Sequence, residues 1–422
     1  MKIVAIILFV AMYVLMIAKP RYRHITALVT ALIYIICGIL PVSEILPSID
    51  FNVLLMILGT MMIVSYFIDS KMPSLIADKI LDLAPNVCWV TILMSLFAGV
   101  VSAFIDNVAT LLIVAPIAIE ICKKLRINPV PMVISIAVSS NLQGAATLVG
   151  DTTSIMLGAY AGMDFTDFFV MDGKPGMFWV VEAGAAATIP IMLFMFRKEK
   201  QPVSAKEKTT VEDYVPTFLM LAMVLSLIIA SFIPNKPSVT NGVICCVIGG
   251  ITMLVEWLMH HDMDALERCG ASLDIQLVLL LSGLFMVIGG IKNVGVIDDL
   301  AALIAKAGEN NLFLLYTIVV WGSVAISAFI DNIPYVATML PVLQGVTKVM
   351  GISPYLLYFG LLSGATLGGN ITPIGASCNI AAVSLLRKEG KEVSFPDFMK
   401  IGVPFTLAAV FVAYVLIWMI WA

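Results

Sequence analysis

Two aspartate–asparagine pairs stand inside strongly apolar sequence, and their side chains are well suited to bind an ion. Asp106 and Asn107 end the segment Ser-Ala-Phe-Ile-Asp-Asn, which recurs 225 positions later and there ends in Asp331 and Asn332. A carboxylate at membrane depth costs several kcal/mol unless it is paired or protonated. The recurring motif therefore predicts a duplicated ion site. Helix capping is the simpler alternative, because Asp and Asn are favoured N-cap residues, and one residue can serve both roles.

The recurrence extends beyond these pairs. It continues without a gap to Pro116 and Pro341, with seven of fifteen positions identical. A second match lies at the same offset, where Gly-Ala-Ala-Thr-Leu-Val-Gly at 144–150 corresponds to Gly-Asn-Ile-Thr-Pro-Ile-Gly at 369–375. Two motifs at one offset indicate an internal duplication.

The second motif predicts helices that unwind in mid-membrane. Glycine costs about 1 kcal/mol relative to alanine inside a helix, and Pro373 adds a further break. Unwound backbone offers carbonyl oxygens to Na+, while the half-helix that follows points its positive end at an anion. Close helix packing through small residues is the alternative explanation of these glycines. Asp151 has no acidic counterpart, because Ala376 occupies the equivalent position, so any role for it breaks the symmetry.

These motifs define two sets of candidate site residues. The predicted ion-binding residues are Asp106, Asn107, Asp331, Asn332, Gly150 and Gly375. The predicted substrate-binding residues are Asn141, Thr147, Asp151, Thr152, Asn370, Thr372, Ser377 and Asn379.

The composition indicates the solvent that surrounds these sites. Apolar residues make up 61% of the 422 residues, charged residues 12%, and the mean hydropathy is +1.04. These values predict an all-α, multi-pass protein of the plasma (inner) membrane that contacts lipid. The net charge of −4 includes no basic run that would favour a nucleic-acid partner. The seven cysteines and three histidines lack metal-ligand spacing, so we expect no cofactor and no metal beyond a coupling Na+.

Apolar segments and loop charges predict the topology. Segments long enough to span a bilayer lie at 2–18, 25–41, 52–68, 177–196, 215–233, 238–259, 273–290 and 401–421. We interpret the first as a retained helix, since it lacks a basic leader and a small-residue cleavage site. An external amino terminus places 18 of the 24 Lys and Arg residues in cytoplasmic loops, including 19–24 and 197–214.

The predicted fold is a pair of inverted repeats with re-entrant helical hairpins and mid-membrane unwound helices. Asp50 corresponds to Asp274 and Gly59 to Gly283, and three spans between the repeats invert the second one. The predicted parts are N-terminal scaffold helices at 1–45, repeat 1 at 46–196, a cytoplasmic linker with connecting helices at 197–268, and repeat 2 at 269–422. Repeat 1 contains hairpin 87–126 and broken helix 129–160. Repeat 2 contains hairpin 311–350 and broken helix 354–386.

The motifs around Asp331-Asn332-Ile333-Pro334-Tyr335 and 368–377 resemble the ion-transporter superfamily, in particular the branch of arsenite permeases, NhaD-type Na+/H+ antiporters and the melanosomal P protein, whose domain is described as citrate-transporter-like. The resemblance covers most of the chain. It implies an elevator-type motion and a homodimer. The distantly related dicarboxylate/sodium symporters carry Ser-Asn-Thr where this chain has Asp106-Asn107-Val108, so the resemblance does not imply dicarboxylate transport.

From the residues we expect a secondary active transporter that couples Na+ or H+ to the movement of a small anion. A Na+/H+ antiporter is the alternative, because two added carboxylates favour cations. A passive channel is a third interpretation, since re-entrant hairpins also build selectivity filters. We expect no enzymatic activity, because the sequence has no Ser/His/Asp set and no nucleotide-binding loop.

Overall fold

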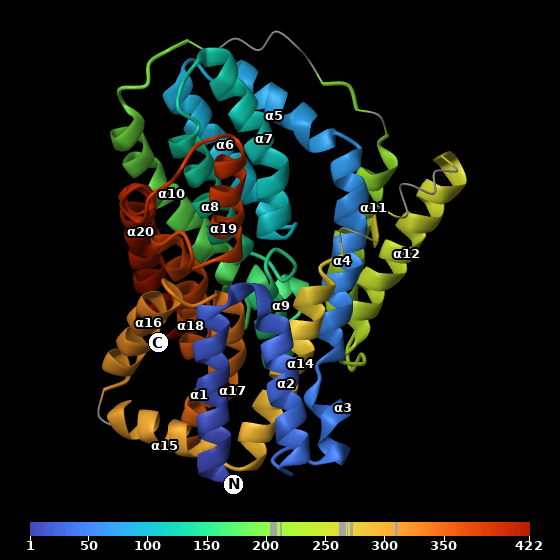
Figure 1. Cartoon of the computed structure of the whole chain (residues 1–422), viewed down its shortest axis with the longest axis vertical. Coiled ribbons are helices and arrows are strands. Elements are labelled where there is room, and N and C mark those ends of the chain that lie inside the picture. The colour runs from blue at the N-terminus through green and yellow to red at the C-terminus, as the bar shows by residue number, and fades with distance from the viewer. Residues whose placement is uncertain (203–208, 212, 261–266, 268, 271–272, 309–310) are drawn as a thin grey trace.

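The computed structural model consists almost entirely of α-helices (Figure 1). The described residues are 1–202, 209–211, 213–260, 267, 269–270, 273–308 and 311–422. Parts of two loops that we predicted to be cytoplasmic, 197–214 and 260–272, therefore lie outside the described residues.

The elements of the first half of the chain are α1 (Lys2–Ala18), η1 (Pro20–Tyr22), α2 (Arg23–Ile36), η2 (Val42–Glu44), α3 (Ile45–Ser48), α4 (Phe51–Asp69), α5 (Met72–Leu83), α6 (Val87–Ser102), α7 (Asn107–Leu125), α8 (Val130–Gly144), α9 (Thr152–Ala161), η3 (Phe165–Phe168), β1 (Val170–Met171), β2 (Lys174–Pro175) and α10 (Met177–Phe196). Those of the second half are α11 (Val215–Ser231), α12 (Thr240–His260), α14 (Ile275–Asn293), α15 (Val296–Gly308), α16 (Leu312–Ser327), α17 (Asn332–Met350), α18 (Tyr355–Gly368), η4 (Gly369–Ile371), α19 (Ser377–Lys388) and α20 (Phe395–Trp421).

The same order of helices occurs in both halves. Each half has two helices joined by a short loop, a long apolar helix, an amphipathic helix, a helical hairpin, a broken helix and a final apolar helix. The hairpins are α6–α7 and α16–α17, and the broken helices are α8–α9 and α18–α19. The two motifs found in the sequence thus fall at equivalent places, the hairpin tips and the helix breaks.

The apolar helices agree with the predicted spans except at some ends. Five described helices are long and apolar enough to cross a membrane, namely α4, α10, α12, α14 and α20, and α1 and α11 are shorter apolar helices. The span expected at 25–41 ends as a helix at Ile36, because the turn that follows contains Gly38 with a left-handed φ of +69°. α20 begins six residues earlier than expected, where Ser394 caps it by accepting from the N–H of Asp397.

Glycines allow two pairs of helices to pack closely. α4 packs against α12, and a methyl group on Gly59 would lie 2.2 Å from the carbonyl carbon of Cys245. α14 packs against α2, and a methyl on Gly283 would lie 2.8 Å from the carbonyl carbon of Ala27. The predicted correspondence of Gly59 with Gly283 therefore matches two equivalent helix crossings. α1 completes one three-helix bundle with α2 and α14, and α11 completes the other with α4 and α12.

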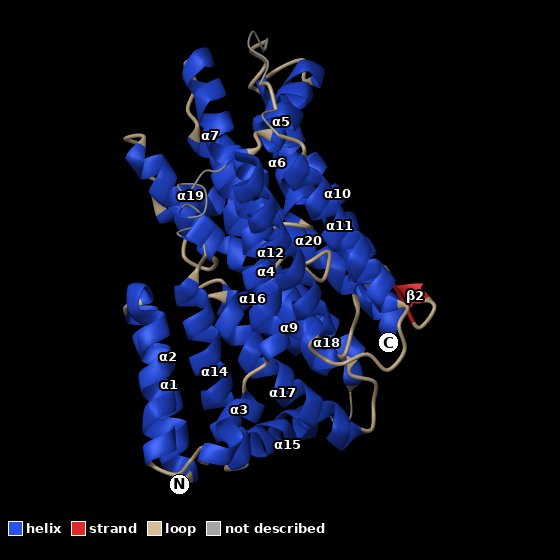
Figure 2. Ribbon diagram, turned by 90° about the vertical axis from the view of Figure 1, so that its right-hand side faces the viewer, coloured by secondary structure: helices blue, strands red, loops and turns tan. Residues whose placement is uncertain are grey.

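The amphipathic helices lie at opposite ends of the molecule. Figure 2 shows α5 near one end and α15 near the other. α5 packs on the α6–α7 hairpin, and α15 packs on α16 and α17. Each therefore supports the hairpin that follows it in the chain.

The hairpins and broken helices of the two halves interlock. α9 packs against α17 and α18, while α19 packs against α7 and α8. Polar side chains that are buried here include Ser139, Ser140, Asn141, Thr366 and Asn370. This interlocking brings residues about 225 positions apart to one place.

Candidate functional site

Helix ends with opposite polarity meet where the site was predicted. α6 and α8 end beside each other, where a methyl on Gly144 would lie 3.5 Å from Ser102 Oγ, and they leave backbone carbonyls without a partner inside the helix. α7 and α9 begin close to these ends with their N–H groups. α16, α18, α17 and α19 repeat this arrangement in the second half. Carbonyl ends favour a cation and N–H ends favour an anion. The arrangement can therefore hold charges of both signs.

Three backbone carbonyl oxygens converge on each of the two predicted glycines. A methyl group on Gly150 would lie 2.6 Å from the carbonyl oxygens of Gly144 and Ser102 and 2.7 Å from that of Ala103. At Gly375, a methyl would lie 2.5 to 2.8 Å from the three equivalent oxygens. Only glycine leaves this space open, and converging carbonyls at unwound helices are the ligands that such proteins offer to Na+.

Two threonines join the helix breaks to the hairpin tips. The Thr147 hydroxyl donates to the carbonyl of Ala103, and the Thr372 hydroxyl donates to that of Ala328. Each hydroxyl also accepts from the backbone N–H two positions further on, at 3.3 Å. We predicted both threonines to bind substrate, but the structure places their hydroxyls in backbone contacts that fix the carbonyl geometry.

Asp106 caps α7 and also faces a cavity. Its Oδ1 accepts from the N–H groups of Val108 at 3.0 Å and Ala109 at 3.2 Å. The cavity has a volume of about 440 Å³, and Asp106 lines it. Asp106 is therefore both a helix cap and a residue of the cavity wall, where a site residue is expected.

Both halves of the chain contribute to the cavity wall. The predicted site residues that line it are Asp106, Asn107, Asp151, Thr152, Asn332 and Ser377. α4 and the start of α14 form much of the remaining wall, which includes Thr60, Ser65 and Asp274. The two hairpin tips therefore share one chamber, as the duplicated motif led us to expect.

An unbroken chain of amides joins the two halves behind the cavity. The Asn107 Nδ2 donates to Asn141 Oδ1 at 2.8 Å, and Asn141 Nδ2 donates to Asn370 Oδ1 at 3.0 Å and to the carbonyl of Thr366 at 2.7 Å. Asn370 in turn donates to the carbonyl of Val138 at 2.9 Å. Asn141 and Asn370, both predicted to bind substrate, are fully buried, and their hydrogen bonds connect the broken helices of the two halves.

The side chain of Asn379 also binds backbone carbonyls. Its Nδ2 donates to the carbonyls of Gly369 at 2.9 Å and Thr372 at 3.1 Å, on either side of the second break. The predicted residues that lie outside the cavity wall are Asp331, Gly150, Gly375, Asn141, Thr147, Asn370, Thr372 and Asn379.

Asp331 forms an ion pair with Arg23, which we did not predict as a site residue. Nη1 of Arg23, at the start of α2, lies 2.7 Å from Asp331 Oδ2, and the Ser377 hydroxyl donates to the same oxygen at 2.7 Å. The Arg23 Nη1 also donates to Ser377 Oγ at 3.2 Å. We had counted Arg23 only as a loop charge. A carboxylate in apolar sequence does call for a countercharge, but that signal does not say which basic residue supplies it.

α1 holds the same hairpin from a second position. The Tyr13 hydroxyl donates to the carbonyl of Pro334 at 2.6 Å and lies 2.6 Å from Oγ1 of Thr338. Tyr13 and Arg23 therefore attach the α1–α2 pair to the first two turns of α17.

Asp151 directly precedes α9 and lies almost fully buried at the cavity wall. The Thr153 hydroxyl donates to its Oδ2 at 2.5 Å and lies 3.0 Å from the hydroxyl of Thr366. The second half places Ala376 at the equivalent position. Asp151 therefore gives the first half a second carboxylate and makes the site asymmetric.

Asn107 and Asn332 also differ, although they are equivalent in sequence. Asn332 is 3% exposed and lines the cavity, and its Nδ2 has no hydrogen-bond partner in the described part of the chain. Asn107 Nδ2 is used by Asn141. A free amide donor in the cavity wall is suited to an acceptor oxygen on a ligand.

A second cavity lies against the other hairpin. It has a volume of about 900 Å³ and is lined by α14, by α3 and by α17 at Ala337, Leu340 and Pro341. Asp50 lines it, whereas its counterpart Asp274 lines the smaller cavity. The two cavities thus occupy equivalent positions on the two halves.

Metal-binding clusters of the usual kind are not found in the described residues, where no group of three His, Cys, Asp or Glu side chains is arranged to hold a metal ion. The ligands that this site offers to a cation are therefore oxygen atoms of the backbone and of a few carboxylates and amides.

The chain matches the sequence model of the citrate transporter family, CitMHS, over residues 13–362. It belongs to that family. An uncharacterized transporter of Mycobacterium tuberculosis is 29% identical over 99% of both chains. The P protein of Sus scrofa is 25% identical over 95% of this chain and 57% of its own length. The resemblance to the P-protein branch is thereby confirmed.

A solved structure has the same fold. The Neisseria gonorrhoeae MtrF antimetabolite efflux pump matches with a TM-score of 0.60 over 92% of this chain and 83% of its own, at 14% identity. This citrate transporter family member is therefore a multi-pass membrane transporter that moves a small molecule, and it is not an enzyme.

Proposed function

We propose that the protein is a secondary active transporter that couples Na+ or H+ to the movement of a small anion. The observation that carries this proposal is the shared cavity, in which the carboxylates of Asp106 and Asp151 face the guanidinium of Arg23 and the free amide of Asn332. A chamber with groups of both signs is suited to a cation and an anion that travel together.

The cation is bound on the first half. Asp106 supplies a charge in the cavity, and the carbonyls that converge near Gly150 supply neutral oxygens close to it. Binding of Na+ or H+ neutralises the carboxylate before the site crosses the low-dielectric part of the bilayer, where an unpaired charge is costly. This neutralisation is the physical basis of the coupling.

The anion is bound on the second half. Arg23 Nη1 is used by Asp331 and Ser377, and a guanidinium has further N–H donors in a fixed planar fork that suits a carboxylate or phosphate. The N-terminal N–H groups of α17 and α19 also carry partial positive charge, which favours an anion. The family description of citrate transport is consistent with an anionic substrate.

Alternating access follows from inverted repeats, and we propose that the two halves are related in this way. α9 lines the smaller cavity at Thr152 and the larger one at Met156, while α17 does so at Ile333 and Ala337. Four helical residues rise about 6 Å, so a barrier of about one turn separates the cavities. With the amino terminus outside, the smaller cavity opens to the cytoplasm. From the family resemblance we also propose an elevator-type motion and a homodimer.

A Na+/H+ antiporter is the second candidate. The observation in its favour is that Asp106 and Asp151 both line the cavity, so that two protons or one Na+ could be exchanged there.

A flux screen in proteoliposomes tests the proposal. Na+, pH and several anions, with citrate among them, are varied separately while uptake is measured. Uphill anion accumulation that follows a Na+ or H+ gradient supports the anion transporter. Na+-driven proton movement without any anion requirement supports the antiporter, and purely downhill flux would reveal a channel.

A further inference from the structure

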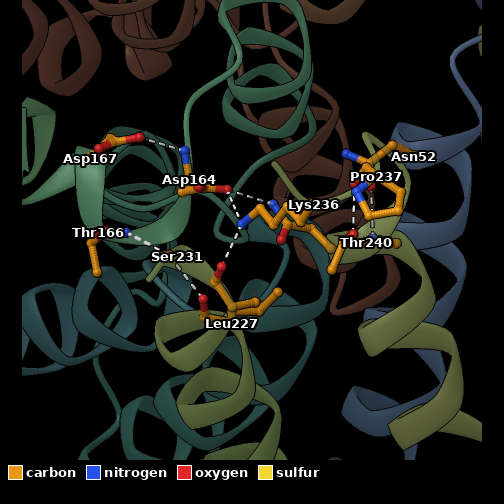
Figure 3. Close-up of polar contacts among 12 residues, drawn as sticks. Asn52, Asp164, Thr166, Asp167, Leu227, Ser231, Lys236, Pro237 and Thr240 are labelled. Carbon is orange, nitrogen blue, oxygen red and sulfur yellow. Dashed lines mark hydrogen bonds and ion pairs between the residues drawn. The ribbon is translucent and has the colours of Figure 1, made fainter. Parts of the chain in front are cut away.

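Two ion pairs attach the three-helix bundles to the hairpins and broken helices. Arg23, the first residue of α2, binds Asp331 at the tip of the second hairpin. Lys236, in the loop between α11 and α12, binds Asp164 after α9, with Nζ 2.5 Å from Oδ1 (Figure 3). Lys236 and Asp164 are partly buried, with 15% and 25% of their side chains exposed, and Lys236 also donates to the carbonyl of Ala230 at 2.9 Å.

The two basic residues lie close to equivalent helix connections. α1 and α11 both have 17 residues, ending at Ala18 and Ser231. Arg23 and Lys236 each lie five positions beyond those ends. α2 and α12 pack at equivalent glycines of α14 and α4. Each half therefore has one cation close to the connection between the two helices that begin it.

Their acidic partners are also members of equivalent pairs. Asp331 corresponds to Asp106 at the offset of 225, and Asp164 and Glu389 each lie within three residues of the end of the second part of a broken helix, α9 and α19. In this structure Arg23 binds a hairpin tip, whereas Lys236 binds the residue that follows a broken helix. The two halves therefore form different ion pairs from corresponding sets of residues. Asp106 and Glu389 are the carboxylates that Arg23 and Lys236 do not bind in this structure.

From this asymmetry we propose that the ion pairs exchange when the transporter changes the side to which it opens. In the opposite state Lys236 binds Asp106, and Arg23 leaves Asp331 and binds Glu389. The physical reason is that inverted repeats reach the second state by exchanging their conformations, so each half then makes the contacts that the other makes now.

This proposal rests on the proposed function and gives Lys236 a specific role in it. Among the described contacts, Asp106 accepts only from backbone N–H groups, so its carboxylate is available to a coupling cation in this structure. In the opposite state the Lys236 ammonium takes that place. A tethered, compact cation on a flexible chain then displaces the coupling ion and keeps the carboxylate neutralised while the site is unloaded.

The present partners of the exchanging groups permit the change. Glu389 is bound by Lys123 at 2.5 Å, and 32% of its side chain is exposed, so Arg23 would replace one partly hydrated ion pair by another. The Asp164 carboxylate also accepts from Asn241 Nδ2 at 3.5 Å, so it keeps a hydrogen-bond donor when the lysine leaves. The Lys123 side chain is 61% exposed, so the loss of its pair with Glu389 costs little free energy.

Cysteine cross-linking separates an exchange from a fixed attachment. Arg23 Nη1 lies 3.2 Å from Ser377 Oγ, so Arg23→Cys with Ser377→Cys reports the present state. Thr152 is equivalent to Ser377 at the offset of 225. Lys236→Cys with Thr152→Cys therefore reports the opposite state. The pairs are introduced into a variant without the seven native cysteines that is shown to retain flux, and they are joined with a short bifunctional thiol reagent in proteoliposomes.

We expect both pairs to cross-link, and a reversed ion gradient to raise the yield of one pair while it lowers that of the other. If the Lys236–Thr152 pair does not react under any gradient, the exchange is refuted. Failure of the Arg23–Ser377 pair would refute it as well, because the starting contact would then be absent. Neither outcome depends on which ion or anion is transported, so the flux screen remains a separate test of the proposed function.

Isosteric neutralisation of the two loop carboxylates gives a second test with native Arg23 and Lys236. Leu112 lines the smaller cavity and is half-exposed, so a cysteine there reports its accessibility to a thiol reagent. Asp164→Asn weakens a contact of the present state and should lower the labelling rate by about fivefold, whereas Glu389→Gln weakens a contact of the opposite state and should raise it by a similar factor. Lys123→Gln removes only the present partner of Glu389. Because 61% of the Lys123 side chain is exposed, this pair contributes little, and the variant should lower the rate only slightly. Shifts of the two variants in the same direction would overturn the proposal.

Discussion

Arg23 and Asp331 are 308 positions apart in the chain, yet the arginine Nη1 lies 2.7 Å from the aspartate Oδ2. The equivalent carboxylate, Asp106, accepts only from backbone N–H groups in the described contacts. Two motifs that are identical in sequence are therefore unequal in charge. The first tip keeps a net negative charge, and the second is neutralised by the protein itself.

Asp106→Asn should abolish the dependence of transport on the coupling cation. The amide retains the capping geometry, because Asn is as good an N-cap as Asp, so the protein should stay folded while the charge that attracts Na+ or H+ is lost. Uptake is measured in proteoliposomes with and without a Na+ or pH gradient, and folding is checked by gel filtration and thermal unfolding.

Asp50→Asn is the matched control for that variant. Asp50 also caps a helix, accepting from the N–H of Val53 at 3.2 Å, but it lies outside the smaller cavity. Its neutralisation should leave coupling intact. Coupling that persists fully in Asp106→Asn would reject Asp106 as the cation site.

Arg23→Gln should weaken anion uptake and destabilise the protein by about 1–3 kcal/mol, since it leaves the Asp331 carboxylate partly buried without a countercharge. The side chains of Arg23 and Asp331 are only 25% and 14% exposed. Asp331→Asn in the same chain should restore most of the stability but not the anion affinity. Denaturant unfolding of the four variants in a double-mutant cycle measures the coupling energy. A coupling energy near zero would contradict the ion pair.

Gly150→Ala should destabilise the protein by about 2 kcal/mol or more and abolish cation-dependent transport. The added methyl would lie 2.6 Å from two carbonyl oxygens of the backbone, which a fixed helix end cannot easily move. Gly322→Ala serves as the control, because nothing lies within 4 Å of a methyl at that position of α16, and it should be neutral or stabilising by up to about 1 kcal/mol. Equal effects of the two substitutions on thermal unfolding would show that the carbonyls do not converge as described.

Asn141→Ala should cost about 2–4 kcal/mol of stability. It removes the central amide of the chain and leaves Asn107 Nδ2 and Asn370 Oδ1 buried without these partners, at about 1–3 kcal/mol each. Ser135→Ala is the comparison, because the Ser135 hydroxyl only donates to the carbonyl of Pro131 within its own helix. Thermal unfolding in detergent distinguishes the two, and a loss no larger than that of Ser135→Ala would exclude the bridging role.

The location of the motifs could be predicted because it depends on local chemistry. An Asp-Asn pair interrupts an apolar run wherever it occurs, and a cluster of glycines breaks a helix irrespective of its surroundings. The hairpin tips at 106 and 331 and the breaks after Gly144 and Gly368 therefore lie where the sequence indicated. The end of α2 was misjudged by five residues, because hydropathy continues through Gly38 while the backbone does not remain helical.

The hydrogen-bond partners of individual polar side chains could not be predicted in this way. Thr147, Asn141 and Asn379 were expected at the substrate, and the structure uses their groups to bind carbonyls and amides behind the cavity. A polar residue beside a helix break has two uses, as a ligand or as a support, and the choice depends on which backbone groups lie within 3 Å of it. That information is absent from spacing and composition.

The sequence by itself determined the membrane environment, the duplication and the two acidic tips, because hydropathy, an exact repeat and the cost of a charge in lipid need no coordinates. Only the tertiary structure decided that the tips share a cavity and that Arg23 neutralises one of them. The reason is that an ion pair depends on distance in space, and packing of α2 against α14 and of α9 against α17 brings together residues that the chain keeps hundreds of positions apart.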